Sequence, residues 1–337
     1  MKQVSAYLVL FLLLIGLSGC EKEEIDNNEF TFEPTSEYIA VFGDIQCYTY
    51  YKELTHHYQH SLDWISKKLD EGCHFNCILQ TGDLTEKNEL DGWNRFSNAI
   101  GKIATRIPCY SVIGDHDYVR TGARILDRKE THFNEFVQFP LSTQKVVAWF
   151  EEGRMENVVV ENTIHGQHLD LLILEFGPRS EVIKWANAYV KAHPDHLFIV
   201  MNHEYLSMIG GRRKTGLACT LRLRNTTYNT PEQVWNRLIK CNDNIRVVLC
   251  GHVWGLYLQV VETNNFGREI TQIEHNIQND AYCDDNWLML WEFPIDSDWA
   301  NVCIYNTRTG KYYDDKKVLF QFQYRDEVPN LSSRLDR

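Results

Sequence analysis

Five short polar segments, each placed after or within an apolar run, constrain the fold of this chain more than any other feature. Four of them join a glycine to aspartate or histidine, and the fifth joins histidine to glutamate. The segments are Gly43-Asp44-Ile45-Gln46, Gly82-Asp83-Leu84-Thr85-Glu86, Gly114-Asp115-His116-Asp117, Asn202-His203-Glu204 and Gly251-His252. An α/β protein gathers metal ligands by placing carboxylates and imidazoles at the ends of several strands. The ordered series from Asp44 to His252 therefore predicts a metal centre.

The apolar runs beside these segments alternate with helical patterns. Residues 38–42, 76–80 and 109–113 are predicted to be buried strands, and residues 54–69 and about 93–103 to be helices. Such a succession is typical of parallel βαβ units. Farther along, the patterns predict a hairpin of 158–160 and 169–174, a helix at 180–192, buried strands at 197–201 and 245–249, and alternating strands from 256 onward. We expect one domain in which two mixed sheets pack face to face between outer helices.

The composition limits the classes of partner that the chain can bind. With 337 residues and 44% hydrophobic residues, the chain is large enough to bury a substantial core. Its net charge of -12 argues against binding of nucleic acid, because phosphate backbones require clustered Lys and Arg. An acidic protein still binds phosphorylated ligands when metal ions carry the positive charge. The sequence leaves the oligomeric state open.

The first residues have the pattern of a secretory signal rather than of a membrane-spanning helix. Lys2 is followed by a short apolar run, and Leu17-Ser18-Gly19-Cys20 closes it. A cysteine in that context resembles the lipobox of bacterial lipoproteins, which implies cleavage before Cys20 and attachment of lipid to it. We therefore expect a signal peptide at 1–19, a polar tether at 20–36, the folded domain at 37–326 and a polar tail at 327–337. This organisation implies an exported cell-envelope lipoprotein. The outer membrane and the cell surface are candidate locations, and the sequence leaves the membrane leaflet open.

The order of the five polar segments resembles the signature of calcineurin-like metallophosphoesterases. The shared elements are Asp-x-Gln, Gly-Asp-x-x-Glu, Gly-Asp-His-Asp, a lone His after a strand, and Gly-His. The chain is most similar to bacterial lipoprotein members that carry Gln in the first motif. The resemblance implies an α/β fold, namely a four-layer αββα sandwich of two mixed β-sheets flanked by helices. It also implies two divalent metal ions at the strand ends and a small phosphorylated substrate.

Carried over residue by residue, the resemblance assigns six metal ligands. They are Asp44 and Gln46 for the first metal, Asp83 as the bridge, and Asp115, His203 and His252 for the second metal. Oxygen and imidazole ligands suit Mn, Fe or Zn. Two such cations, roughly 3.5–4 Å apart, hold a hydroxide and stabilise both the attacking and the leaving oxygen.

The same resemblance assigns the proton donor and indicates substrate contacts. His116 is expected to be the general acid that protonates the leaving alkoxide, and Asp117 is expected to orient and charge its ring. Tyr48 follows the first motif on a predicted loop over the site, where it either contacts substrate or packs within the loop. Trp254 either stacks on the substrate or packs in the wall of the site.

Two residues depart from the family pattern. The family usually has Asn where Asp115 stands, and His where Trp254 stands. An indole nitrogen donates only and cannot bind a metal, so we expect a weak first metal site and a firm second one. Three hypotheses remain open: a two-metal phosphoester hydrolase, a one-metal hydrolase, and a non-catalytic binding lipoprotein on the same fold.

Overall fold

The computed structural model describes residues 29–122, 124–217, 221–224, 226–253, 255, 257–276 and 287–326. The predicted signal peptide, Cys20, Trp254 and the predicted tail at 327–337 lie outside these residues, as does most of the predicted tether. In the described ranges, no helix combines the length and the apolar character needed to cross a bilayer.

The first sheet, in the described part of the chain, has seven strands and carries the amino-terminal βαβ units. Its strands are β1 (Glu37–Phe42), β2 (His74–Gln80), β3 (Cys109–Ser111), β15 (Trp287–Phe293), β16 (Trp299–Asn306), β17 (Lys311–Tyr312) and β18 (Phe320–Gln323). They lie in the order β17-β16-β15-β1-β2-β3, and β18 pairs with β16. Strands β1, β2 and β3 are parallel, whereas β15 runs antiparallel to β1. Both faces of β1 are covered, which explains its continuous apolar sequence.

The second sheet, counted over the same described residues, has eight strands. They are β6 (Val146–Trp149), β7 (Val158–Val160), β8 (Thr163–Ile164), β9 (Gln167–Leu174), β10 (Leu197–Asn202), β12 (Ile245–Cys250), β13 (Leu258–Thr263) and β14 (Glu269–Glu274). Their order is β13-β14-β12-β10-β9-β7-β6, and β8 pairs with β9. Strands β9, β10, β12 and β14 are parallel, so their carboxyl ends meet at one edge of the sheet. The predicted hairpin is confirmed by the antiparallel pairing of β7 with β9.

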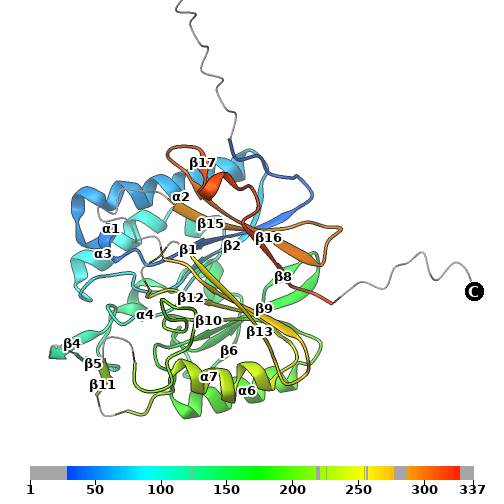
Figure 1. Cartoon of the computed structure of the whole chain (residues 1–337). Coiled ribbons are helices and arrows are strands. Elements are labelled where there is room, and N and C mark those ends of the chain that lie inside the picture. The colour runs from blue at the N-terminus through cyan, green and yellow to red at the C-terminus, as the bar shows by residue number, and fades with distance from the viewer. Residues whose placement is uncertain are drawn as a thin grey trace, which may run out of the picture.

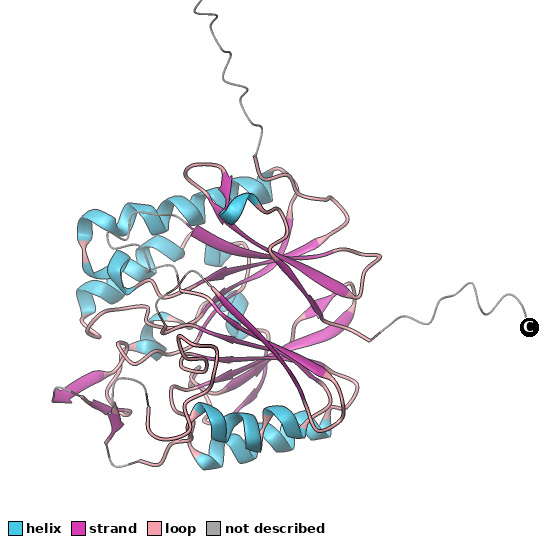
Figure 2. Ribbon diagram, viewed as in Figure 1, coloured by secondary structure: helices cyan, strands magenta, loops and turns pink. Residues whose placement is uncertain are grey.

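Helices cover the two outer faces of the paired sheets. The α-helices of the described residues are α1 (Gln46–Tyr50), α2 (Thr55–Asp70), α3 (Leu90–Ile100), α4 (Phe133–Phe136), α5 (Pro140–Thr143), α6 (Ser180–Ala192) and α7 (Pro231–Arg237). Figure 1 shows α1, α2 and α3 outside the first sheet and α6 and α7 outside the second. Figure 2 shows the strands of both sheets between these two layers of helices. The predicted αββα sandwich is therefore confirmed.

Alternate residues of the second sheet contribute to two different cores. Leu171 and Ile173 of β9 belong to the large apolar cluster that both sheets share. Leu172 and Leu174, which point to the opposite face, belong to a smaller cluster with Val182 and other residues of α6 and α7. Because successive side chains of a strand point to opposite faces, this division is the packing expected of a sheet between a second sheet and a layer of helices.

A small third sheet extends beside the second main sheet. It consists of β4 (Val119–Gly122), β5 (Ile125–Asp127) and β11 (Arg222–Leu223), in the order β11-β5-β4. Figure 1 shows it at the lower left of the view, away from β16 and β17.

Candidate metal centre

The five polar segments all lie at the carboxyl ends of parallel strands. Asp44, Asp83 and Asp115 follow β1, β2 and β3 of the first sheet, and His203 and His252 follow β10 and β12 of the second. Both sheets present these ends at the same edge of the sandwich, which is where open α/β sheets bind their ligands. The strand order thus brings together residues separated by as much as 208 positions, such as His252 and Asp44.

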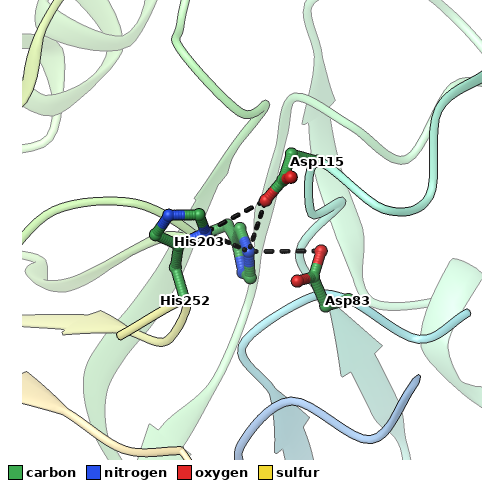
Figure 3. A group of neighbouring side chains, drawn as sticks. All are labelled: Asp83, Asp115, His203 and His252. Carbon is green, nitrogen blue, oxygen red and sulfur yellow. Dashed lines mark hydrogen bonds and ion pairs between the residues drawn. The ribbon is translucent and has the colours of Figure 1, made fainter. Parts of the chain in front are cut away.

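Four of these side chains converge closely enough to hold one metal ion. The ligand atoms of Asp83, Asp115, His203 and His252 all lie within 4.8 Å of one another. His203 Nε2 lies 3.2 Å from Asp83 Oδ1 and 3.4 Å from Asp115 Oδ1, and His252 Nδ1 lies 3.0 Å from Asp115 Oδ1 (Figure 3). Two carboxylates and two imidazoles, nearly all buried, form a donor set that suits Mn, Fe or Zn. These four residues therefore fit a divalent cation.

Glycine precedes three of the converging residues because the backbone approaches too closely for a side chain. A Cβ at Gly82 would lie 2.5 Å from His203 Nδ1, and one at Gly114 would lie 2.1 Å from Asp83 Oδ1. At Gly251 a Cβ would lie 2.4 Å from Asp44 Oδ1. The glycines thus pack the strand ends tightly enough to bring the ligands within reach of one another.

Two of the ligands themselves adopt backbone conformations that L-residues rarely use. Asp83 has a φ of 50° and His252 a φ of 73°. Such strain persists only where the surrounding structure imposes it, and it concentrates at functional sites.

The orientation of His203 is fixed by a backbone contact. Its Nδ1 lies 2.8 Å from the carbonyl oxygen of Thr81, so Nδ1–H donates to that oxygen and Nε2 faces the centre. Metal-binding histidines usually have their second nitrogen held in this manner, which sets the tautomer and the direction of the ring.

The centre concentrates negative charge that a cation or a proton must balance. Burial lowers the pKa of His203, but the charges of Asp83 and its hydrogen-bonded neighbour Asp115 outweigh burial and hold this pKa well above its usual value. Burial raises the pKa of Asp115, yet hydrogen bonds from His203 and His252 hold it well below its usual range. A protonated His203 here helps to balance the carboxylates, and binding of a divalent cation would release that proton.

Asp44 lies beside this group rather than within it. Its Oδ1 is 4.0 Å from His203 Nδ1, and its Oδ2 accepts a hydrogen bond of 2.7 Å from the side-chain amide of Asn276. The backbone N–H of His252 also donates to the Asp44 carboxylate, at 3.1 Å. The predicted first-site ligand Gln46 donates from Nε2 to Asp83 Oδ2 at 3.1 Å. Two amide groups therefore contact the carboxylates of the predicted first metal site.

Asn276 and Arg120 were not among the residues selected from the sequence. Asn276 lies two residues after the end of β14, and the only signal for it was its place near a strand end. Arg120 Nη2 lies 3.1 Å from Asp115 Oδ2, from β4 of the third sheet. Its guanidinium, 38% exposed, adds a positive charge at the rim of the centre.

His116 also lies at this rim, with its ring 22% exposed. Its Nδ1 lies 2.9 Å from the backbone carbonyl oxygen of Glu86 and 3.2 Å from Glu86 Oε2, and its Nε2 is 3.7 Å from Asp115 Oδ2. Burial lowers the pKa of His116, but Asp83 and Glu86 raise it to about 10. In the metal-free protein these carboxylates thus favour the protonated ring, which is the form that a general acid requires.

The prediction that Asp117 orients the His116 ring is wrong. Asp117 is fully buried, and its oxygens accept hydrogen bonds from the backbone N–H groups of Gly114 at 2.9 Å and of Thr85 at 2.8 Å. Adjacent residues in this bend point in different directions, so Asp117 joins two loops while Glu86 contacts the ring. Burial raises the pKa of Asp117 to about 7.

Tyr48 does not contribute to a substrate-binding surface. The predicted loop is instead α1, and the Tyr48 side chain is 1% exposed within the large apolar cluster. Its ring packs 6.2 Å from that of His57. Of the two alternatives for Tyr48, packing is correct and substrate contact is wrong.

A polar cleft opens near the centre. Its volume is about 590 Å³, and Tyr118, which directly follows Asp117, is part of its wall. The cationic side chains along it are Arg128, Lys129, Arg154, Arg179 and Arg224. Arg128 Nη1 donates to the carbonyl oxygen of Phe176, whose ring lies 6.3 Å from the ring of His252. Four carboxylates, Glu151, Glu156, Glu175 and Glu181, line the same cleft, so its positive and negative charges nearly balance.

Comparison with known proteins agrees with this geometry. The family model for calcineurin-like phosphoesterase matches residues 38–254. Because this match covers more than half of the chain, the protein belongs to the calcineurin-like phosphoesterase family.

Individual relatives are distant. An uncharacterized protein of Bacillus subtilis, YvnB, is 22% identical over 281 residues, which cover 79% of this chain and 20% of the relative. This chain thus spans about one fifth of that protein's length.

Two solved structures align with this chain at low similarity. A purple acid phosphatase from yellow lupin aligns with a TM-score of 0.49 and 12% identity, over 83% of this chain and 53% of its own. The sulfate thiohydrolase SoxB of Thermus thermophilus aligns with a TM-score of 0.46 and 10% identity, over 85% and 60%.

Proposed function

We propose that this chain is an exported, lipid-anchored, metal-dependent phosphoester hydrolase that uses His116 as its general acid. The observation that carries the proposal is the convergence of Asp83, Asp115, His203 and His252, with a protonated imidazole at the rim. A site that only bound a metal for structural reasons would not need a proton donor beside it.

Each group has a defined task in the proposed reaction. Asp83, Asp115, His203 and His252 would hold a divalent cation of the Mn, Fe or Zn kind. Such an ion polarises the phosphoryl oxygens and lowers the pKa of water. His116 donates its proton to the leaving oxygen, and Glu86 holds its ring through Nδ1. The positive charge of Arg120 at the rim favours a small substrate with negative charge.

The first metal position is proposed to be weak. Asp44 and Gln46 are its expected ligands, and both make hydrogen bonds to other site residues. An amide oxygen from Gln46 is a weaker ligand than a carboxylate. A one-metal hydrolase on the same scaffold is therefore a second candidate, and it requires that activity saturate at one ion per chain.

Hydrolysis of p-nitrophenyl phosphate and of bis-p-nitrophenyl phosphate, with added Mn²⁺, tests the proposed activity. We expect turnover of at least one ester by the wild-type protein and its loss in His203→Ala together with the bound Mn²⁺. His132→Asn is a matched control, because His132 is a partly exposed histidine paired with Glu135 outside the centre. Absence of turnover in protein that retains Mn²⁺ would instead support the non-catalytic binding lipoprotein.

Export and lipid attachment rest on the first twenty residues, in which Cys20 follows Leu17-Ser18-Gly19 as in the lipobox of bacterial lipoproteins. We expect the wild-type protein to sediment with membranes and Cys20→Ser to remain in the soluble fraction of the exported pool. Equal partitioning of the two proteins would rule out an anchor at Cys20.

A further inference from the structure

A second group of metal-ligating side chains lies at the opposite edge of the second sheet. His168, Asp170 and His196 each offer one ligand atom, and these atoms lie within 4.8 Å of one another. His168 and Asp170 belong to the start of β9, and His196 directly precedes β10. His196 and His203 are separated by the length of β10, roughly 20 Å at a rise of ~3.3 Å per residue. This group is therefore distinct from the catalytic centre.

The register of the sheet brings the three side chains together. Leu197 pairs with Leu169 in the parallel ladder, so His196 lies beside His168 one position earlier. His168 and Asp170 are two residues apart on one strand and therefore share a face of the sheet. The two imidazole rings stack with centroids 3.7 Å apart and an angle of 9° between their planes.

Both imidazoles direct the same nitrogen toward one carboxylate. His196 Nδ1 lies 2.7 Å from Asp170 Oδ2, and His168 Nδ1 lies 3.5 Å from Asp170 Oδ1. Asp170 is 1% exposed. The Nδ1 atom of His168 is buried and makes no hydrogen bond within the described part of the chain. A buried polar atom of this kind needs a partner, and a cation between the three groups would supply one.

The surrounding backbone holds the group in place. The Asn244 side-chain amide donates to the carbonyl oxygens of Val190, His193 and His196, at 3.1, 2.9 and 3.0 Å. These bonds fix the turn between α6 and β10. Asp170 Oδ1 also accepts a hydrogen bond of 3.1 Å from the backbone N–H of Asn162. The ligand atoms are thus preorganised on rigid elements, as a metal site requires.

We propose that His168, Asp170 and His196 form a second site, which binds a divalent cation of the Zn²⁺ kind. Two imidazole nitrogens and one carboxylate oxygen are ligands that Zn²⁺ accepts at about 2.0–2.2 Å, with water in the fourth tetrahedral position. His168 is 35% exposed and His196 20%, so the site opens to solvent on that side. A cation here joins the β8–β9 hairpin to the turn before β10, and its role is to stabilise these elements.

Zn²⁺ binding to a variant without the catalytic ligands tests this site. In His203→Ala/His252→Ala protein, we expect one Zn²⁺ per chain to remain after gel filtration. Adding His196→Ala or Asp170→Asn should weaken Zn²⁺ binding by roughly 10–100-fold or more, the range known for disturbed metal sites. His193→Ala is the matched control, because the His193 ring lies 5.4 Å from that of His196 while its Nδ1 contacts the Tyr189 carbonyl oxygen. Retention of Zn²⁺ by all three added variants alike would overturn the proposal.

A second measurement needs no substitution. Carbethoxylation of the wild-type histidines, followed by peptide mass spectrometry, reports the accessibility of each ring. One equivalent of Zn²⁺ beyond that needed to fill the catalytic centre should protect His168 and His196 and leave His132 reactive. Unchanged modification of His168 and His196 at that ratio would contradict the site. The rate of ester hydrolysis with Mn²⁺ should not depend on His196, which separates this proposal from the proposed function.

Discussion

His116 is the residue on which the proposed chemistry depends most directly. Replacing it with Asn removes the proton donor but leaves the four metal ligands in place. We expect kcat for an ester with a poor leaving group to fall by about 10²–10⁴-fold, with an unchanged Mn²⁺ content. Steady-state kinetics and elemental analysis of the same sample check this. A loss of bound Mn²⁺ equal to the loss of rate would show that His116 supports the metal rather than the leaving group.

Glu86 provides a test of how the general acid is kept protonated. Its Oε2 lies 3.2 Å from His116 Nδ1, and its charge helps to raise the pKa of His116. Because the acid is active only when protonated, activity falls as the pH rises through this pKa. Glu86→Gln lowers the pKa and therefore should move the alkaline limb of the pH–kcat profile to lower pH. Glu135→Gln, beside His132, should leave the limb unmoved, and an equal shift in both variants would contradict the assignment.

The predictions from the sequence were wrong at positions where the direction of a side chain determines which residue it contacts. His116 and Asp117 are neighbours in the chain, but their side chains diverge, and the residue beside the ring is Glu86, thirty positions earlier. Tyr48 was expected on a loop, whereas α1 buries it. Asn276 was not predicted to be a site residue because no glycine motif accompanies it in the sequence. Spacing along the chain predicts which strand end a residue occupies, but not the direction of its side chain.

At the scale of elements, the turns after the parallel strands set the geometry of the site. A Cβ at Gly114 would lie 2.1 Å from Asp83 Oδ1 and 2.3 Å from the Asp83 backbone nitrogen. Gly114→Ala should therefore displace Asp83 and reduce the affinity for Mn²⁺ by tenfold or more, on the order of 1.4 kcal/mol. Gly122→Ala is the control, since its nearest neighbour would be Ile125 Cδ1 at 3.8 Å. Calorimetric titration with Mn²⁺ measures both, and equal affinities would show that the turn tolerates the side chain.

Asp117 links two of these turns through hydrogen bonds to their backbones. It accepts hydrogen bonds from the backbone of Leu84 and Thr85 after β2 and of Gly114 after β3. Asp117→Asn replaces one acceptor oxygen with an N–H₂ group that faces backbone donors. The free energy of unfolding should fall by about 1–3 kcal/mol, as measured by urea denaturation. A pH–rate shift without a loss of stability would instead restore the role in orienting His116.

The sandwich itself follows from patterns that the sequence contains. Continuous apolar runs such as 38–42 and 197–201 are typical of parallel strands buried on both faces, and they form β1 and β10. Strands that are followed by a glycine and a ligand residue then place those ligands at one edge of the sandwich. The third sheet and its Arg120 were not predicted, because two- to four-residue strands carry too little periodicity.

At the scale of the whole molecule, the buried carboxyl of Glu274 links stability to pH. Burial, together with the charge of Asp44, raises its pKa to about 10. The folded protein then keeps a proton that the unfolded chain, with an ordinary pKa, releases above pH 4–5. In the metal-free protein, stability conferred by this proton is complete below that range and declines as the pH rises toward 10.

Glu274→Gln removes that dependence because the amide does not titrate. Its advantage in unfolding free energy over the wild type should grow with pH between about 5 and 10, by at most about 1.4 kcal/mol per pH unit. Glu269→Gln, an exposed position on the same strand, should show no such trend. Urea unfolding of the two variants and the wild type at several pH values, with a chelator present to keep the protein metal-free, distinguishes Glu274→Gln from Glu269→Gln. A constant difference across that range would mean that Glu274 is ionised in the folded state.

The central claim is tested most directly by adding Mn²⁺ back to metal-free protein. The bound Mn²⁺ and the hydrolysis of bis-p-nitrophenyl phosphate or of p-nitrophenyl phosphate are then measured on one sample. The account predicts that the rate rises in proportion to the Mn²⁺ retained and that His203→Ala and Asp115→Ala lose both together. Full turnover by metal-free protein, or full Mn²⁺ retention by both variants, would contradict it.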